Sequence, residues 1–218
     1  MTSSSSLRTR DLTSDDLESA FDVRSRSFGS LDPSMRDWWN GIHHESVEAN
    51  RAIGIFDGTR LLGHAKVPPY QQFWGGRRMP MSGVAGVVVA PDARGRGVGS
   101  QLMTALAHRS RELGDLVSAL YPATITMYRA LGWAVAGAQY RISIPAEALR
   151  RLGGSDVHLR IATESDVEPF LKSLGDGYAA RRANGPKLPP RGRGQGAVHR
   201  RRDDELPHRW WPRRLRVA

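Results

Sequence analysis

A glycine-rich turn that follows an apolar stretch is the part of this sequence best suited to chemistry. Residues 87–100 read VVVAPDARGRGVGS, so β-branched residues lead into a turn of small and basic residues. Its glycines and arginines are Arg94, Gly95, Arg96, Gly97 and Gly99. Free backbone N–H groups at a helix start bind phosphates, glycine lets a phosphate approach the backbone, and arginine adds positive charge. The turn therefore predicts a diphosphate site.

Two other phosphate-binding turns do not fit this spacing. The turn of the NTPases needs GxxxxGK[ST], which is absent here. The dinucleotide turn needs GxGxxG and an acidic residue after the next strand, whereas this sequence has GxGxG and Tyr121-Pro122. The remaining pattern is R-x-x-G-x-G, carried by Arg94, Gly97 and Gly99. A flexible glycine-rich turn without a ligand stays open as the alternative.

A tyrosine about thirty residues further along is the second candidate for chemistry. Residues 119–133 read ALYPATITMYRALGW, in which Tyr128 comes shortly before Gly132 and Trp133. A phenol with a pKa of about 10 can supply a proton to a leaving group. The alternative interpretation is that Tyr128 is an aromatic core residue.

The elements that must position these residues follow from local patterns. Residues 79–90 (MPMSGVAGVVVA) predict a buried central strand, and 97–113 predict a helix with apolar residues on one face. The expected elements that follow are a strand at 116–121, a helix at 125–131, a strand at 133–144 and a helix at 145–152.

The first third of the chain predicts a strand, two helices and a hairpin. The strand lies at 7–10, and Thr13 or Ser14 can cap the helix that follows. A second helix is expected to begin near Asp32-Pro33. Apolar runs at 51–56 and 61–67 flank Asp57-Gly58, which indicates a hairpin ended by Pro68-Pro69.

The positive charge is concentrated at the end of the chain. The net charge is +10, but residues 178–218 carry eleven Arg and one Lys against three acidic residues. The rest is nearly neutral, so a basic groove for nucleic acid is not predicted. There are no cysteines, which fits a reducing cytoplasm, and neither a secretory signal nor a membrane-spanning segment is predicted.

The segment from 157 onward has the same outline as the start of the chain. A short strand, a capped helix start and an apolar stripe follow a Gly153-Gly154-Ser155 linker, in the order seen from Leu7. This predicts the opening of a second domain of related design. From about Lys187 the sequence becomes rich in Arg, Gly and Pro without apolar periodicity.

Taken together, these motifs resemble the GNAT N-acetyltransferases, and within them the enhanced intracellular survival (Eis-like) acetyltransferases of actinobacteria. The shared pattern is V-x-V-A-P-x-x-R-x-R-G-x-G, then A-L-Y, then M-Y-R-x-L-G-W. The resemblance covers about residues 7–185 and implies an α+β GNAT fold with a mixed central sheet. The expected domains are a GNAT domain at 1–153, an incomplete second GNAT-like domain at 154–186, and a basic, disordered tail at 187–218.

The resemblance also implies roles for individual residues. The strand residues Val87, Val88 and Val89 pair through their backbone with the pantetheine arm, and the Val89 region donates to the thioester oxygen. Tyr128 is the general acid that protonates the sulfur of CoA. Ala123 and Thr124 stand where the family often has Ser-Glu against the cofactor, so that contact is in doubt. The residues implied to hold the diphosphate are Arg94, Gly95, Arg96, Gly97, Val98, Gly99 and Ser100.

The resemblance implies an enzyme that transfers an acetyl group from acetyl-CoA to an aminoglycoside-like or lysine-type amine. It implies no metal, and assembly as a homohexamer. The family's general base is its own C-terminal carboxylate on a third domain, and that role is not transferred to Ala218. The tail is either a nucleic-acid-binding extension or a shifted reading frame; we favour the shifted frame, which makes the chain truncated. The alternatives are a CoA-binding or nucleic-acid-binding module without turnover, and an inactive fragment.

Two weaker hypotheses concern residues 32–48. Trp38 and Trp39 are candidates for lining an acceptor pocket, with at least one of them in the core. The adjacent His43 and His44 point to different sides of a helix, so a shared metal is not expected and solvent exposure is favoured. Several acidic side chains can attract a cationic amine or are ordinary helix-face charges: Asp32, Asp37, Glu45 and Glu48.

Overall fold

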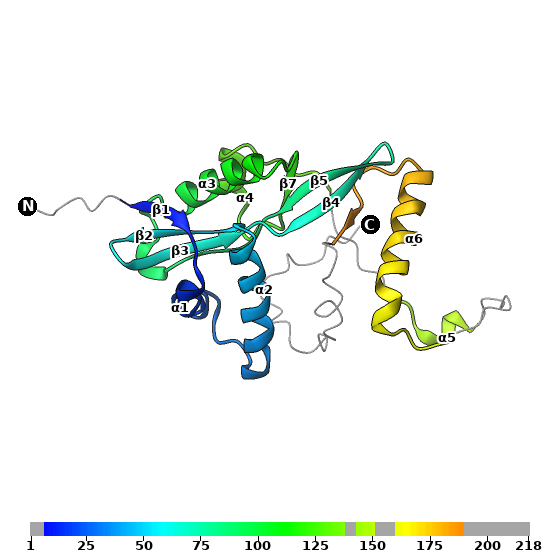
Figure 1. The fold of residues 1–218 in the computed structure, drawn as a ribbon, viewed down its shortest axis with the longest axis horizontal. Helices are drawn as coiled ribbons and strands as arrows, with labels where there is room; N and C mark the ends of the chain where they lie inside the picture. The colour runs from blue at the N-terminus through cyan, green and yellow to red at the C-terminus, as the bar shows by residue number, and fades with distance from the viewer. Residues whose placement is uncertain (1–6, 138–142, 151–159, 190–218) are drawn as a thin grey trace, which may run out of the picture.

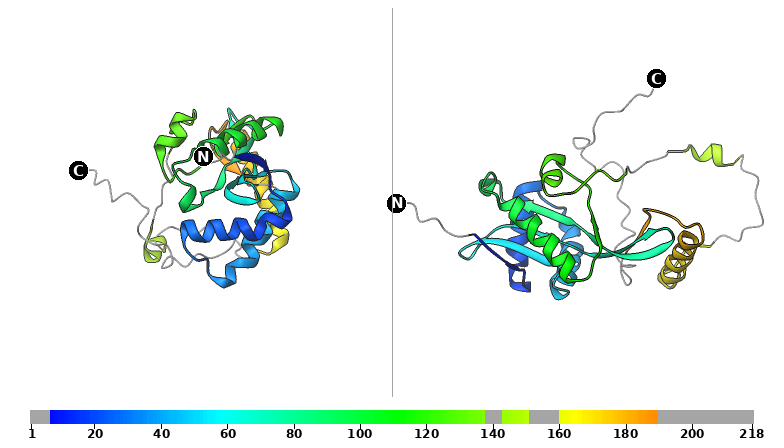
Figure 2. Two further views of the ribbon diagram at one scale, coloured as in Figure 1. Left: turned by 90° about the vertical axis from the view of Figure 1, so that its left-hand side faces the viewer. Right: turned by 90° about the horizontal axis from the view of Figure 1, so that it is seen from above.

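The computed structural model describes residues 7–137, 143–150 and 160–189. Within these residues the strands form two four-stranded sheets, in the orders β1-β2-β3-β6 and β7-β5-β4-β8. The two sheets follow one another along the long axis of the molecule, as the views in Figures 1 and 2 agree. The architecture is α+β, as predicted.

The first sheet is antiparallel throughout and carries the hairpin predicted from the Asp-Gly pair. Its strands are β1 (Arg8–Asp11), β2 (Ala52–Asp57), β3 (Arg60–Lys66) and β6 (Ala85–Val89). The β2–β3 turn passes through Gly58, whose φ of 59° lies in the left-handed region that glycine adopts without steric cost. β6 and β1 are the two edge strands of this sheet.

Helices cover both faces of the first sheet. α1 (Leu17–Phe28) and α2 (Arg36–Glu48) lie on one side, and α3 (Val98–Glu112) lies on the other (Figure 1). A 3₁₀ turn, Ser14–Asp16, precedes α1 and is capped by Thr13, whose backbone N–H donates to Asp16 Oδ2 at 2.8 Å. The predicted cap of the first helix is therefore confirmed.

The second sheet combines antiparallel and parallel pairing. Its strands are β7 (Val117–Ala119), β5 (Arg77–Gly83), β4 (Pro69–Trp74) and β8 (Lys187–Leu188). Only β5 and β7 run parallel to each other. The sequence reasoning missed β4, because it took Pro68-Pro69 only as the end of a strand. Proline is also tolerated as the first residue of a strand, which is the place of Pro69.

The predicted single central strand at 79–90 is divided into two strands. β5 ends at Gly83 and pairs with β7, whereas β6 begins at Ala85 and pairs with β3, so Val84 alone separates them. The N–H of Val84 donates to Ala119 O at 2.9 Å. Beyond this bond, no backbone pairing joins β6 to residues 120–137, the described part of the chain that follows β7. The prediction was wrong because apolar, β-branched composition does not show where a long strand exchanges neighbours.

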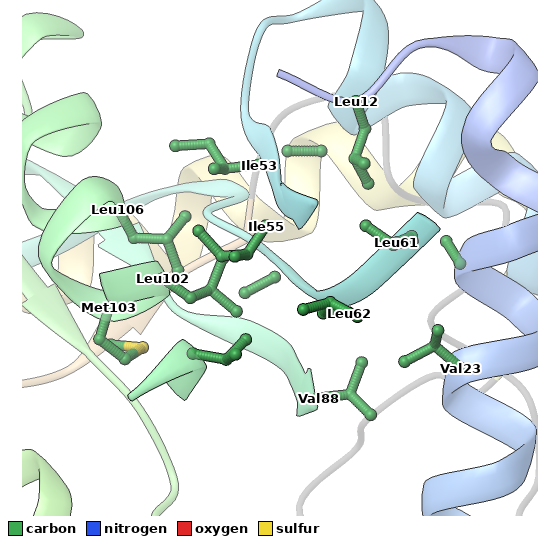
Figure 3. Close-up of a cluster of buried hydrophobic side chains, with 14 of the residues drawn as sticks. Leu12, Val23, Ile53, Ile55, Leu61, Leu62, Val88, Leu102, Met103 and Leu106 are labelled. Atoms are coloured by element: carbon green, nitrogen blue, oxygen red, sulfur yellow. The ribbon is translucent and has the colours of Figure 1, made fainter. Parts of the chain in front are cut away.

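The core lies between the first sheet and its helices. Figure 3 shows Leu102, Met103 and Leu106 of α3 directed at Ile55 of β2, with Val88 and Val23 on the α1 side. Leu102, Met103 and Leu106 have no exposed surface. Burying a side chain of this kind contributes about 1.5–3 kcal/mol, so α3 is held firmly against the sheet.

Two short helices follow β7. α4 (Ile125–Ala130) confirms the helix predicted at 125–131, and α5 (Ala146–Leu149) lies within the one predicted at 145–152. The strand predicted at 133–144 is not formed in its described parts, 133–137 and 143–144; residues 138–142 lie outside the described residues. Val135 is 74% exposed, so its apolar side chain has no neighbouring strand to pack against.

The start of α6 (Val167–Ala180) repeats the start of α1. Arg10 binds both carboxylate oxygens of Asp16, and Arg160 binds both oxygens of Asp166 in the same way. Thr163 caps the second turn as Thr13 caps the first, with its N–H 2.7 Å from Asp166 Oδ2. The sequence outline shared by the two segments thus corresponds to one hydrogen-bond pattern. A second GNAT-like domain stays a prediction.

Residues after α6 return to the second sheet. Gly185 N–H donates to Phe73 O at 2.7 Å, and Lys187–Leu188 form β8 at the edge of β4. Tyr178 of α6 meets Phe73 edge to face, with ring centroids 5.3 Å apart. The expected tail therefore begins with two paired residues, and its part from 190 onward lies outside the described residues.

Candidate active site

The glycine-rich turn opens α3 as the sequence predicts. Gly95 and Gly97 both have a φ of 78°, and Gly97 is the N-cap residue of the helix. The N–H of Gln101 is the first to close a helical turn, onto Gly97 O at 3.0 Å. By helix geometry the N–H groups of Val98, Gly99 and Ser100 have no acceptor within the helix. They are available to an anion at this end of α3.

Space for a ligand exists over the turn. A β-carbon built on Gly95 or on Gly97 would have no atom within 4 Å. The backbone here is exposed, apart from the buried side chain of Val98, which anchors the helix start in the core. Ser100 is also exposed. The turn is therefore open where a diphosphate would approach.

The two arginines of the turn differ. Arg96 forms an ion pair with Asp57 Oδ2 at 3.2 Å, across the turn between β2 and β3. Arg94 is exposed, and within the described part of the chain no ion pair is recorded for it. Arg94 is therefore the better placed of the two to add charge to a bound anion, although the sequence gives both the same role.

The backbone of β6 has one edge committed to β3 and one edge turned away. Ala90 N–H donates to Leu62 O at 2.7 Å, and Val88 is opposite His64. Because peptide groups alternate along an extended strand, Val88 uses its backbone on β3, whereas Val87 and Val89 face away. The carbonyl of Val89 confirms this direction, since it accepts a hydrogen bond from Ser27 Oγ at 3.0 Å.

This alternation corrects one sequence expectation. Val88 cannot pair through its backbone with a pantetheine arm, because that backbone belongs to the β3–β6 ladder; its buried side chain is part of the core. The backbones of Val87 and Val89 are directed away from β3, toward the gap that begins at the Val84–Ala119 hydrogen bond, and the Val89 carbonyl there already accepts from Ser27. Their pairing with a pantetheine arm stays a prediction.

Gly99 joins the turn to the other two parts of the candidate site. A β-carbon on Gly99 would lie 3.2 Å from Met127 Sδ of α4 and 3.8 Å from Val89 Cγ2 of β6. The start of α3, the outer face of β6 and the helix that carries Tyr128 are therefore in contact. The three segments that the sequence singled out meet at one place.

Tyr128 directly follows Met127 in α4 and is 7% exposed. Burial raises the pKa of its phenol above the ordinary value, which keeps the hydroxyl protonated at neutral pH. Its ring meets Trp133 edge to face, with centroids 6.3 Å apart, and Trp133 Nε1 donates to Ser118 Oγ of β7 at 3.1 Å. Tyr128 belongs to the core cluster, so the alternative that the sequence left open, a core aromatic, is compatible with the proton-donor role.

Ala123 and Thr124 lie just before α4, and both are exposed. Thr124 occupies the N-cap position of α4, but its side chain makes no capping hydrogen bond. A contact of these two residues with a cofactor stays a prediction.

On α2, the structure corrects the predicted exposure of His43 and shows which of the two tryptophans lies in the core. His43 is buried rather than exposed, and its ring stacks on Trp39 at a centroid distance of 3.7 Å. His44 is exposed beside Glu48, and Trp39 is the core tryptophan. The i, i+4 spacing of Trp39 and His43 was the available signal for this stack. Asp32 accepts from the N–H of Ser34 at 2.8 Å, which is a capping role.

Other features lie away from these residues. A cavity of about 840 Å³ lies between the second sheet and α6, and its lining includes Tyr70, Arg78, Asp115 and Lys172 but neither the turn nor Tyr128. The described residues hold no group of three or more His, Asp or Glu side chains suited to a metal ion. Among the helices of the same residues, none combines the length and apolar character that a membrane crossing requires.

A strand that parts from its parallel neighbour, a helix that opens on alternate glycines and a tyrosine buried beside them define the acyl-CoA N-acyltransferase class of fold. Comparison with known proteins agrees. The family described as "Acetyltransferase (GNAT) domain" matches residues 8–136, more than half of the chain. The chain belongs to this family of acyltransferases, whose co-substrate is acetyl-CoA.

Individual relatives give the same result. An "Uncharacterized N-acetyltransferase" of Streptomyces avermitilis is 27% identical over 188 residues, which is 84% of this chain and 44% of the relative. A GCN5-related N-acetyltransferase from Kribbella flavida is 45% identical with a TM-score of 0.82, over 85% of this chain and 47% of its own. Eis1 from Mycobacterium abscessus is 26% identical with a TM-score of 0.50, over 60% of this chain and 31% of Eis1. The chain thus spans less than half the length of these relatives.

Proposed function

We propose that this protein transfers an acetyl group from acetyl-CoA to a primary amine. The observation that carries the proposal is the contact of Gly99 with both Met127 and Val89. This contact brings together the start of α3, the outer side of β6 and α4, the helix that carries Tyr128. The proposal assigns them the diphosphate, the pantetheine arm and the proton donor, respectively. A flexible glycine-rich turn that binds no ligand would not need β6 and the helix of Tyr128 beside it.

The residues present fit CoA at its diphosphate end. The N–H groups of Val98, Gly99 and Ser100 would hold the diphosphate, with the open backbone of Gly95 and Gly97 allowing close approach. Arg94 would add charge from outside the turn. Arg96 would act mainly through its ion pair with Asp57, which ties the turn to the β2–β3 hairpin.

The strand edge fits an extended arm. Val87 and Val89 would pair through their backbone with the pantetheine portion, as one strand pairs with another. Acetyl-CoA supplies an activated thioester to this site. A strand N–H beside the thioester oxygen would stabilise the negative charge that develops there during attack.

Tyr128 would hold and deliver the proton that the leaving sulfur needs. Its phenol is protonated at neutral pH because burial raises its pKa. The packing of its ring against Trp133, which is itself hydrogen-bonded to Ser118 of β7, fixes the direction of the side chain. A positioned acid of this kind contributes about 10²–10⁴-fold to a rate.

For the acceptor we propose an Eis-like specificity, toward aminoglycoside-like or lysine-type amines. The likeness to Eis1 and the aromatic residues of α2 on the face opposite α3 support this choice. Assembly as a homohexamer and a cytoplasmic location remain predictions from the family resemblance.

The test is a thiol-release assay with the full chain. Purified protein and acetyl-CoA should release free thiol only when an amine is added, and mass spectrometry should find one acetyl group on that amine. An aminoglycoside, a lysine peptide and a hydroxyl compound without an amine would be compared. Binding of acetyl-CoA without thiol release for any amine would favour the non-catalytic CoA-binding module and overturn the proposal.

A further inference from the structure

A lysine side chain lies between two tyrosine rings at the edge of the second sheet. Nζ of Lys187 is 5.2 Å from the ring centroid of Tyr70 and 5.0 Å from that of Tyr121. Both distances are within the range of a cation–π interaction, in which an ammonium is attracted to the face of an aromatic ring. Three separate parts of the chain, β8, β4 and the residues after β7, therefore meet at one ammonium group. The mechanism above uses none of these three side chains.

Backbone pairing holds the lysine in this position. Lys187 is paired with Gln72 of β4, and the N–H of Phe73 donates to Pro186 O at 2.9 Å. Gln72 and Tyr70 are two residues apart on one strand, so their side chains and that of Lys187 share a face of the sheet. The ammonium is thus brought to the rings by the strand that carries it.

The tyrosine rings lie beside the closed end of the gap, at the Val84–Ala119 hydrogen bond. A β-carbon on Gly83 would be 2.5 Å from Cδ2 and Cε2 of Tyr70, so this ring packs directly on the backbone of the residue before Val84. Tyr121 comes two residues after Ala119 and is 70% exposed. One aromatic ring therefore separates the ammonium from the end of the gap.

The closed end of the gap is where the acetyl group would be held. In the function proposed above, the diphosphate lies at residues 94–100 and the pantetheine arm runs past Val89 and then Val87. The acyl end of the same molecule is therefore the part that comes nearest to Val84. An ammonium group beside this end lies where an amine acceptor must arrive.

The lysine and its tyrosines are on the face of the sheet opposite the proposed acid. Ser118 of β7 accepts a hydrogen bond from Trp133, which packs against Tyr128, so the side chain of Ser118 is on the α4 face. Ser118 is paired with Ser82 of β5, whereas Tyr70 is paired with the residue that precedes Ser82. Neighbours along a strand point to opposite faces. An acceptor can thus approach the gap on the face opposite α4.

We propose that Tyr70 and Tyr121 form a binding site for an ammonium group of the acceptor, and that Lys187 occupies this site as an internal competitor until the acceptor displaces it. The inference rests on the acetyl-transfer function proposed above and deepens it. A cation–π site holds a charged ammonium, whereas the nitrogen that attacks the thioester must carry a free lone pair. The two nitrogens are therefore different, and the favoured acceptor is a diamine or polyamine.

Two acceptors with the same carbon chain separate the roles of the two nitrogens. Cadaverine has an amino group at both ends of its chain, and pentylamine has one. The full chain should show a lower KM for cadaverine. Tyr121→Leu should remove this preference because leucine has no π-face, whereas Tyr121→Phe should retain it. Comparing variants cancels the statistical advantage of a second amino group. The same KM ratio in the wild type and in Tyr121→Leu would overturn the proposal.

Lys187→Met tests the same site with the opposite sign. Methionine keeps an unbranched side chain but carries no charge, so KM for cadaverine should fall about 3–10-fold, the size expected of exposed cation–π contacts. Lys187→Arg keeps a cation at the rings and should retain the wild-type KM. Lys172→Met removes an exposed lysine that pairs with Asp176 on α6, and controls for a general loss of positive charge. A KM for cadaverine that stays the same or rises in Lys187→Met would overturn the proposal.

Binding of cadaverine without acetyl-CoA separates the ammonium site from the reaction. Saturation-transfer NMR should give a lower Kd for Lys187→Met than for the double variant that also carries Tyr121→Leu. Equal Kd values would overturn the ammonium site whether or not the chain is active. Failure of the wild type to release thiol with either amine would instead overturn the acetyl-transfer function, and the two Kd values would still decide the ammonium site.

Discussion

The Sδ atom of Met127 lies against the backbone of Gly99, 3.2 Å from where a β-carbon on Gly99 would be. α4 therefore packs on the first turn of α3, and Tyr128, the next residue after Met127, is held close to the turn that we propose binds the diphosphate. A single small residue thus sets the distance between the proposed cofactor anchor and the proposed acid.

Replacing Tyr128 by Phe removes the proton donor without changing the shape of the ring. We expect kcat to fall about 10²–10³-fold, because the sulfur must leave without a positioned acid. The acetyl-CoA affinity, measured by calorimetry, should change by no more than a few-fold. If affinity is lost while turnover stays the same, Tyr128 is not the acid.

Gly97→Val should weaken acetyl-CoA binding, because a side chain in the open space over the turn blocks the diphosphate. The control is Gly114→Val at the other end of α3. Gly114 has a φ of 80° and no atom within 4 Å of its β-carbon position, so both changes carry the same backbone strain. That strain costs about 1–2 kcal/mol in stability in each case. Only Gly97→Val should lose affinity by calorimetry; equal affinities in the two variants would contradict the assignment of the turn.

The two arginines of the turn should differ in their effect on binding. Arg94→Ala removes an exposed guanidinium and should weaken acetyl-CoA binding about tenfold, in line with a charge-assisted hydrogen bond. Arg96→Ala should cost less, since that side chain is paired with Asp57. The Arg94 effect should shrink as salt is added, because exposed charges are screened. Titrations at low and high ionic strength would show whether Arg96 is instead the stronger contact.

His64 predicts a loss of stability in mild acid. Desolvation lowers the pKa of its buried imidazole from 6.5 to about 4, with Lys66 adding to the shift. Below pH 6.5 the unfolded chain therefore binds a proton that the folded chain does not, so the free energy of unfolding falls as the pH drops toward 4. The loss amounts to about 3 kcal/mol at 1.36 kcal/mol per pKa unit. Thermal melts between pH 7 and 4 would measure it, and His64→Gln should flatten the slope; an unchanged slope would assign the acid sensitivity to other groups.

The turn and the tyrosine could be predicted from sequence because their chemistry depends on residue type. Alternate glycines at a helix start and a tyrosine near Gly132 and Trp133 are visible in one chain. The second sheet was harder. Pro69 begins β4 and Val84 separates β5 from β6, and each depends on which strand lies alongside.

The role of Val88 and the burial of His43 could not be predicted for the same reason. Whether the backbone of Val88 is available is decided by its pairing with His64, which no property of valine indicates. The side chain of His43 reaches from α2 to His64 of β3 and to Gly86 of β6, so only the arrangement of three separate elements reveals its surroundings. Local sequence describes side chains, whereas long-range pairing decides which of their atoms remain accessible.

The hydrogen bond from Val84 N–H to Ala119 O has a consequence for the size of what can be held. This bond is the apex of the wedge-shaped gap between β6 and the chain that follows β7. One amide therefore sets how far an inserted chain can enter before it meets paired backbone. Removing that donor would move the apex deeper toward β5. From that apex β5 continues into the second sheet, where β4 and then β8 lie alongside it, so the point that limits insertion is continuous with the far end of the molecule.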